Sequence, residues 1–153
     1  MEAISVGIGS VFEQAIRYLL LMYTVDEPLS EDRINCLDFI TTYAADFGIG
    51  SSNLHGNGGY RFGEFTSRAL TANKALLELA QRGLIHIKPT SQGCFYVITD
   101  NGNDFINSLD SSYVSLYAEI ADRVDYRFKD KPTRNLHRMI TRRIQDSVKD
   151  IKL

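Results

Sequence analysis

The chain has 153 residues, of which 44% are hydrophobic and 24% are charged, and its net charge is −2 at neutral pH. This composition is typical of a globular domain with a proper core and excludes a disordered chain. The most apolar stretch, residues 18–23, is far shorter than the roughly 20 residues that cross a bilayer. The start of the chain also lacks a basic signal-peptide region, so we expect a cytoplasmic protein without membrane contact.

Two helices are predicted first. Apolar residues recur every three or four positions between Val11 and Tyr23, which is the period of an amphipathic helix. Ser30 is a good N-cap for the next helix, because its hydroxyl can accept a bond from an early amide and two acids follow it. A second apolar stripe runs to Phe47, and Gly48 is expected to end it in a left-handed conformation.

A glycine-rich loop follows, from Gly48 to Gly63, and it holds six of the eleven glycines. A loop of this length without regular structure is uncommon and is usually functional. After the loop we expect a short helix over 64–70, and then a longer helix that Thr71 caps and Gly83 ends.

The apolar period then changes from 3.6 to 2, which predicts a β-hairpin with strands at 84–87 and 94–99. Helix, helix and hairpin in this order, with Arg82-Gly83-Leu84 between them, are typical of a winged helix. We therefore predict an α+β, mainly α fold: a winged-helix body over residues 1–130, with the hairpin as its wing, and a basic amphipathic C-terminal helix over 131–153.

Two further helices complete the predicted body. Asp100 or Asn101 is expected to cap the first, and Ser112 the second. Lys131-Pro132 then interrupts the helical pattern, and Thr133 starts the C-terminal helix.

The C-terminal helix is predicted to be amphipathic. Its apolar side carries Leu136, Ile140, Ile144, Val148 and Ile151. Its basic residues include Arg134, Arg138, Arg142 and Arg143. Residues 1–126 have a net charge of −8, whereas residues 127–153 have +6. The basic side is therefore predicted to contact DNA or an acidic partner, with packing of the apolar side on the body as the plainer alternative.

One polar cluster was considered as a catalytic or metal site. It consists of Asp46, His55, Arg61, Glu64 and Arg68. These spacings match no catalytic or metal-binding motif, and charge-assisted hydrogen bonds that hold the loop account for the residues better. We predict no catalytic residue, metal or cofactor here, and assign the cluster a structural or partner-interface role.

A winged helix can also read DNA through its second motif helix, here about residues 71–82. That helix offers only Lys74 and Arg82 as cations, on an acidic body. Because phosphate contacts dominate the affinity of DNA-binding proteins, this is a poor DNA reader. A winged-helix transcriptional regulator therefore stays as the alternative function.

Several short motifs resemble the middle components of bacterial ABC-three-component systems, a group that includes the Lamassu-type anti-phage systems. In chain order they are Asp46-Phe47-Gly48, Leu54-His55, Tyr60-Arg61, Gly63-Glu64, Arg68 and Arg82-Gly83-Leu84. The resemblance covers residues 11–125. It departs at residues 56–59, where a proline-containing run is expected, and the tail after Pro132 does not map onto the family.

The resemblance implies an adaptor. Such a middle component would bridge an SMC-like ABC ATPase, which senses foreign DNA ends, and an effector such as a nuclease. Winged-helix subunits of SMC complexes bind coiled-coil or head regions as protein-protein modules. The predicted function is accordingly a non-catalytic adaptor subunit of an anti-phage defence complex.

Overall fold

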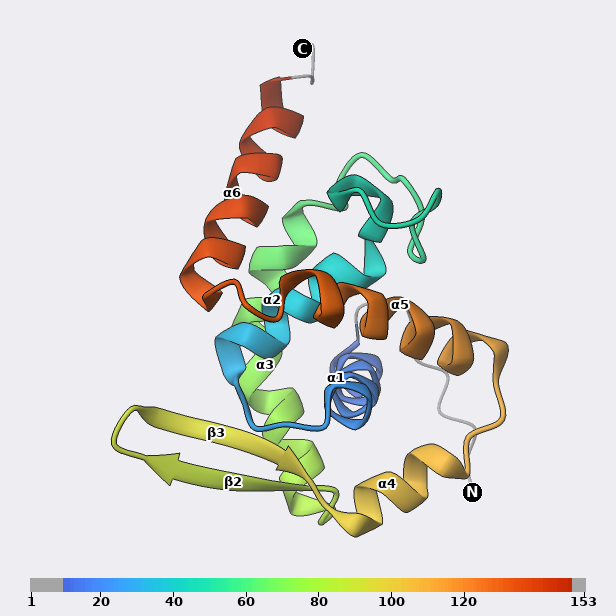
Figure 1. The fold of residues 1–153 in the computed structure, drawn as a ribbon, viewed down its shortest axis with the longest axis vertical. Coiled ribbons are helices and arrows are strands. Elements are labelled where there is room, and N and C mark those ends of the chain that lie inside the picture. The colour runs from blue at the N-terminus through green and yellow to red at the C-terminus, as the bar shows by residue number, and fades with distance from the viewer. Residues whose placement is uncertain (1–9, 150–153) are drawn as a thin grey trace.

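The computed structural model describes residues 10–149, which form a mainly helical fold with one small antiparallel sheet (Figure 1). The elements are α1 (Val11–Val25), β1 (Leu29–Ser30), α2 (Glu31–Thr42), the 3₁₀ helix η1 (Ala44–Phe47), α3 (Gly63–Gln81), β2 (Ile85–Thr90), β3 (Gly93–Ile98), α4 (Asp100–Asn107), α5 (Ser112–Phe128) and α6 (Thr133–Lys149). The predicted α+β, mainly α class is confirmed, with the hairpin and the C-terminal helix in place.

The Ser30 cap and the left-handed Gly48 are confirmed, although Gly48 does not end the helix for which it was predicted. Ser30 caps α2, since its hydroxyl oxygen accepts a bond from the Arg33 amide at 3.2 Å. Gly48 adopts the left-handed conformation with φ +79°, as predicted. It closes η1 rather than α2, which has already ended at Thr42.

The predicted division of α3 at Thr71 is wrong, because α3 is one continuous helix. The Thr71 hydroxyl donates to Gln14 at 2.6 Å instead of capping a helix. The predicted caps of both α4 and α5 lie too late in the chain, by one or two residues for α4 and by one for α5. Thr99 caps α4, since its oxygen accepts from the Gly102 amide at 3.0 Å, and Ser111 precedes α5.

The sheet joins the start of α2 to the hairpin. Its strand order is β1-β3-β2, with both pairings antiparallel. Leu29 and Ser30 of β1 pair with Tyr96 and Phe95 of β3. Strand β1 was not predicted, because a strand of two residues shows no apolar periodicity.

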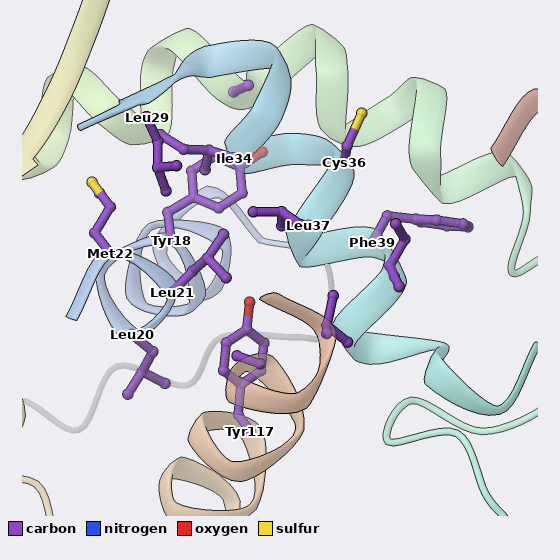
Figure 2. Packing of buried hydrophobic residues seen from close by; sticks show 14 of the residues in the cluster. Tyr18, Leu20, Leu21, Met22, Leu29, Ile34, Cys36, Leu37, Phe39 and Tyr117 are labelled. Carbon is purple, nitrogen blue, oxygen red and sulfur yellow. The ribbon is translucent and has the colours of Figure 1, made fainter. Parts of the chain in front are cut away.

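The core is built around α1, which Figure 1 shows end-on in the middle of the molecule, with α2, α3 and α5 packed against it. Tyr18 and Leu21 of α1 are fully buried beside Leu37 of α2 (Figure 2). Tyr117 points from α5 toward the same two helices and is also fully buried. Burying side chains of this size contributes roughly 1.5–3 kcal/mol each.

The first half of α6 is part of the same core. Leu136 and Ile140 are fully buried, and α6 packs on α2. Along the helix the burial then decreases, since Ile144 is only partly buried and Val148 is 60% exposed. Ile151, the last member of the predicted stripe, lies outside the described residues. The alternative prediction, in which the apolar side of the C-terminal helix packs on the body of the same chain, therefore describes the first half of α6.

Candidate functional site

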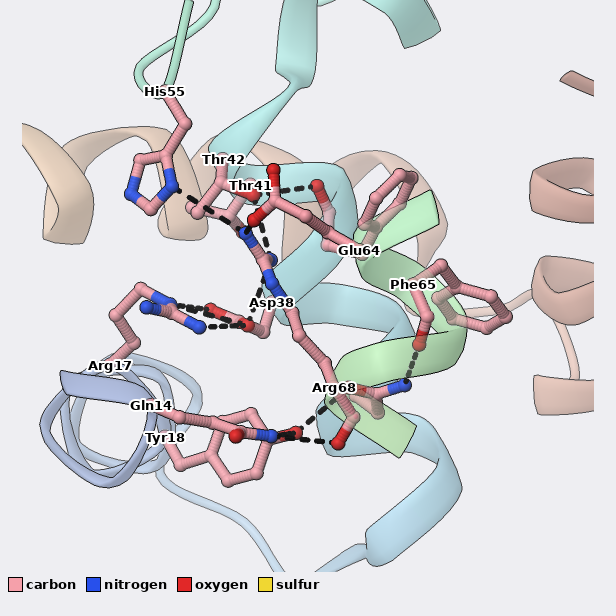
Figure 3. A network of polar contacts seen from close by, with 12 residues as sticks. Gln14, Arg17, Tyr18, Asp38, Thr41, Thr42, His55, Glu64, Phe65 and Arg68 are labelled. Atoms are coloured by element: carbon pink, nitrogen blue, oxygen red, sulfur yellow. Dashed lines mark hydrogen bonds and ion pairs between the residues drawn. The ribbon is translucent and has the colours of Figure 1, made fainter. Parts of the chain in front are cut away.

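Asp38, in the middle of α2, is the centre of a buried polar network (Figure 3). Arg17 of α1 donates from Nε to its Oδ1 at 3.0 Å, and Arg68 of α3 donates from Nη1 to its Oδ2 at 3.1 Å. The Tyr117 hydroxyl of α5 donates to Oδ1 at 2.7 Å. One carboxylate therefore ties the other three helices of the core to α2.

The charges of this network are mutually stabilised. Burial alone would raise the pKa of Asp38, but the charges of Arg17 and Arg68 outweigh it and hold that pKa below its ordinary value. Burial opposes the charge of Arg17, yet its attraction to Asp38 raises the pKa of the guanidinium. Burial and the neighbouring Asp38 charge raise the pKa of Tyr117 well above 10. The phenol thus stays protonated and can donate to the carboxylate.

The network continues outward through Arg68. Its Nη2 donates to Glu64 at 2.9 Å, and its Nη1 donates to the Thr42 hydroxyl at 2.9 Å. Glu64 also accepts a hydrogen bond from the Tyr43 hydroxyl. Arg17, Arg68, Asp38 and Glu64 together carry two positive and two negative charges, so the site is electrically balanced.

His55 connects the glycine-rich loop to this network. Its Nδ1 lies 3.5 Å from Nη2 of Arg68, and its Nε2 lies 2.7 Å from the Tyr113 hydroxyl (Figure 3 shows the Arg68 contact). Burial, together with the charges of Arg68 and Arg17, lowers the pKa of His55 to about 4. The ring is therefore neutral at pH 7, where it holds the loop between α3 and the start of α5.

Asp46 and Arg61 form a separate pair. Arg61 donates from Nε to Asp46 at 2.9 Å and from Nη1 to the carbonyls of Asn57 and Gly58 at 3.1 Å each. Its guanidinium also lies over the Phe62 ring. The structure thus divides the predicted cluster, since Asp46 and Arg61 fasten the loop while His55, Glu64 and Arg68 join the Asp38 network.

The centre of the network was not predicted from the sequence. Asp38 lies four residues after Ile34 and therefore on the buried stripe of α2, and Arg17 is flanked by the apolar residues Ile16 and Tyr18. A charged residue within an apolar stripe is rare unless it is paired. That signal was present in the sequence. Gln14 is likewise buried, and it donates to Tyr18 and to the Arg68 carbonyl, both at 2.8 Å.

A pocket of about 520 Å³ borders the network. It is lined by Phe12, Glu13, Ile16, Arg17, Leu54, His55 and Tyr113. Among the described side chains that line it, His55 and Tyr113 are hydrogen-bonded to each other, and burial raises the pKa of Tyr113 to about 12. A base with a pKa of about 4 and an acid with a pKa of about 12 are poorly matched for proton transfer at neutral pH. Across residues 10–149, no group of three His, Cys, Asp or Glu residues is placed to hold a metal ion.

The four predicted tail arginines lie far from this network. All four are exposed on α6, and none forms an ion pair with another described residue. Arg134, Arg138 and Arg142 follow each other at four-residue spacing, so they form one row with a rise of about 6 Å between members. This row is an exposed, positively charged surface, whereas the Asp38 network is buried and its charges are paired.

A family model described as Middle Component 2 of ABC-three component (ABC-3C) systems matches residues 7–150. The chain belongs to this family. The middle-component resemblance of the short motifs is therefore confirmed. As a Middle Component 2 protein, the chain is one part of a multi-component ABC system and has partner subunits. No curated protein and no solved structure matches it, and no helix in the described part of the chain has the length and apolar character of a membrane span.

Proposed function

We propose that this Middle Component 2 protein is a non-catalytic adaptor, which holds an SMC-like ABC ATPase and a nuclease-type effector together in a Lamassu-type anti-phage complex. The observation that carries the proposal is the placement of the charged residues. Asp38, Arg17 and Arg68 bind each other inside the core, whereas the arginines of α6 face outward. Buried, mutually neutralised charges support a rigid scaffold, and exposed unpaired charges support contact with a macromolecule.

We also propose that the body is a winged helix. The order α1, β1, α2, α3, β2, β3, with β1 at the edge of the hairpin, agrees with that architecture. In this interpretation α3 takes the place of the recognition helix and the β2–β3 hairpin is the wing.

The rival function is a DNA-binding regulator that reads its operator through α3. Arg68 of that helix is buried in the Asp38 network, and Arg82 at its end is paired with Glu78 at 2.8 Å. Lys74 is left as the one cation of α3 without an ion pair among the described residues. Leu70 on the same helix is 82% exposed. A DNA reader needs several phosphate contacts, so a helix with one unpaired cation and an exposed leucine fits the adaptor better.

The exposed arginines of α6 are proposed to contact DNA or an acidic surface of a partner subunit. Arg134, Arg138, Arg142 and Arg143 are the residues concerned. Since these side chains are solvated, the contact is electrostatic and weakens as salt screens it.

The decisive experiment is co-expression of the tagged chain with the ATPase and effector from its own operon. We expect one complex that contains all three, in which Arg138→Glu lowers the yield and increases the salt sensitivity. Lys88→Glu, the same charge change on the exposed wing, is the matched control and should leave the complex intact. A chain that purifies alone, monomeric and at full yield, overturns the adaptor.

Two measurements on the purified chain distinguish the adaptor from the alternative functions. Salt-dependent binding of the isolated chain to a defined operator would support the regulator. A loss of catalytic turnover on His55→Ala, with the fold intact, would show that the protein is an enzyme.

A further inference from the structure

The outward face of α3 is more apolar than a solvated helix requires. Leu70 is 82% exposed and Leu77 is 43% exposed. The two are seven residues apart, which places them on one face of the helix about 10 Å apart. The opposite face, with Ala72, Leu76 and Leu79, is buried in the core. The leucine pair therefore contributes little to the packing of the described chain.

We infer that this face docks an amphipathic helix of a partner component, with apolar side chains seven residues apart that pack on Leu70 and Leu77. The inference rests on the adaptor function proposed above and adds to it the surface and the type of partner. Helices associate along such seams when apolar residues recur with a seven-residue period. Exposed residues occur on α3 from Thr66 to Gln81, a length of about 22 Å along the helix axis. This length accommodates a partner helix of about 15 residues.

The charges on the two edges of the face define the partner further. On one edge, Lys74 is exposed and has no ion pair among the described residues, while its neighbour Glu78 is paired with Arg82 at 2.9 Å. On the other edge, Asn73 donates to Glu31 at 3.4 Å, which places a carboxylate there. A helix with an acid facing Lys74 and a base facing Glu31 matches both edges. Such matching sets the orientation of a docked helix.

Nucleic acid is a poor match to this face. Leucine side chains gain nothing from phosphates, and Glu31 repels them on one edge. A partner helix covers the leucines and satisfies both edges at once.

The test uses the full chain and the purified ATPase and effector components, with affinities measured by biolayer interferometry. We expect Leu70→Glu/Leu77→Glu to weaken binding to one component by about 30-fold or more, as loss of a central apolar contact does. Lys74→Glu should weaken the same interaction, and Lys74→Arg should retain it. Tyr126→Glu, which alters an 82% exposed side chain on α5, is the matched control and should bind normally.

Thermal unfolding first checks that each variant is folded. Because both leucines are exposed, we expect the double variant to fold. Wild-type binding that the double variant leaves unchanged refutes the docking face and keeps the adaptor. A wild-type chain that binds neither component refutes the adaptor and this face with it. A dimer that the double variant converts to a monomer, with component binding unchanged, assigns the face to a second copy. Lost DNA binding on Lys74→Glu, with component binding unchanged, assigns the face to nucleic acid. Either of these last two results overturns the inference.

Discussion

Replacing Asp38 with asparagine tests whether the buried network is what holds the helices together. The substitution keeps the shape of the side chain and an oxygen that can accept the Tyr117 hydroxyl. It removes the only negative charge between Arg17 and Arg68, whose side chains are 3% and 4% exposed. Glu64 still neutralises part of the charge of Arg68. Arg17 forms no other ion pair among the described residues, so it is left buried and uncompensated there.

The expected cost is large. Breaking a buried ion pair by removing one partner typically costs about 3–5 kcal/mol, compared with a total stability of about 5–15 kcal/mol for a domain. For a chain of this length, the melting temperature should fall by roughly 6–20 °C. The loss comes mainly from the stranded guanidinium of Arg17, and in part from the weaker neutralisation of Arg68, rather than from lost packing. A triple replacement of Arg17, Asp38 and Arg68 by apolar residues of similar volume should therefore be more stable than Asp38→Asn alone.

Urea and thermal unfolding, followed by far-ultraviolet circular dichroism, measure these differences. Glu64→Gln is the matched control, because it is the same isosteric change at a carboxylate that is 31% exposed on the outer edge of the network. It should cost less than about 1 kcal/mol. An Asp38→Asn variant within 1 kcal/mol of the wild type would refute the reasoning, and so would equal effects of the two substitutions.

Three further predictions concern stability. Gly102→Ala should lower the free energy of unfolding in urea by about 1–3 kcal/mol, because the new Cβ would lie 2.3 Å from a backbone oxygen. Gly63→Ala is the control, since its Cβ would meet no atom within 4 Å, and it should stay within about 0.5 kcal/mol of the wild type. The pKa of His55 is about 4 in the folded chain but about 6.5 in the unfolded chain. As the pH falls below 6.5, the unfolded chain therefore binds a proton at this residue before the folded chain does. Stability should therefore decrease from pH 6.5 to 4, by about 1–2 kcal/mol for a partly solvated ring, and His55→Gln should remove this component of the pH dependence of the melting temperature. Leu136→Ala should cost about 2–5 kcal/mol and Val148→Ala less than about 0.5 kcal/mol; equal effects would contradict the packing of α6.

The candidate site shows where prediction from the sequence stops. The five residues of the predicted cluster share a polar character and proximity in the chain, and local spacing could not divide them. The structure separates them because Arg61 reaches from the loop to Asp46 of η1, whereas Arg68 points from α3 toward α2. Side-chain direction depends on how whole helices pack, and spacing along one segment does not contain that information.

The sequence by itself determined much of the local structure. The apolar period of α1, the Ser30 cap, the left-handed Gly48 and the change of period at the hairpin all follow from interactions within a few residues, which short patterns record. Its motifs also indicated the middle-component family.

Only the tertiary structure decided the role of Asp38. Its partners lie 21, 30 and 79 residues away in the chain, on three different helices. A buried charge is tolerable only where those helices meet, because its desolvation must be offset by all of the partners together. For the same reason, only the packed fold shows that Leu70 and Leu77 face outward while their neighbours on α3 are buried.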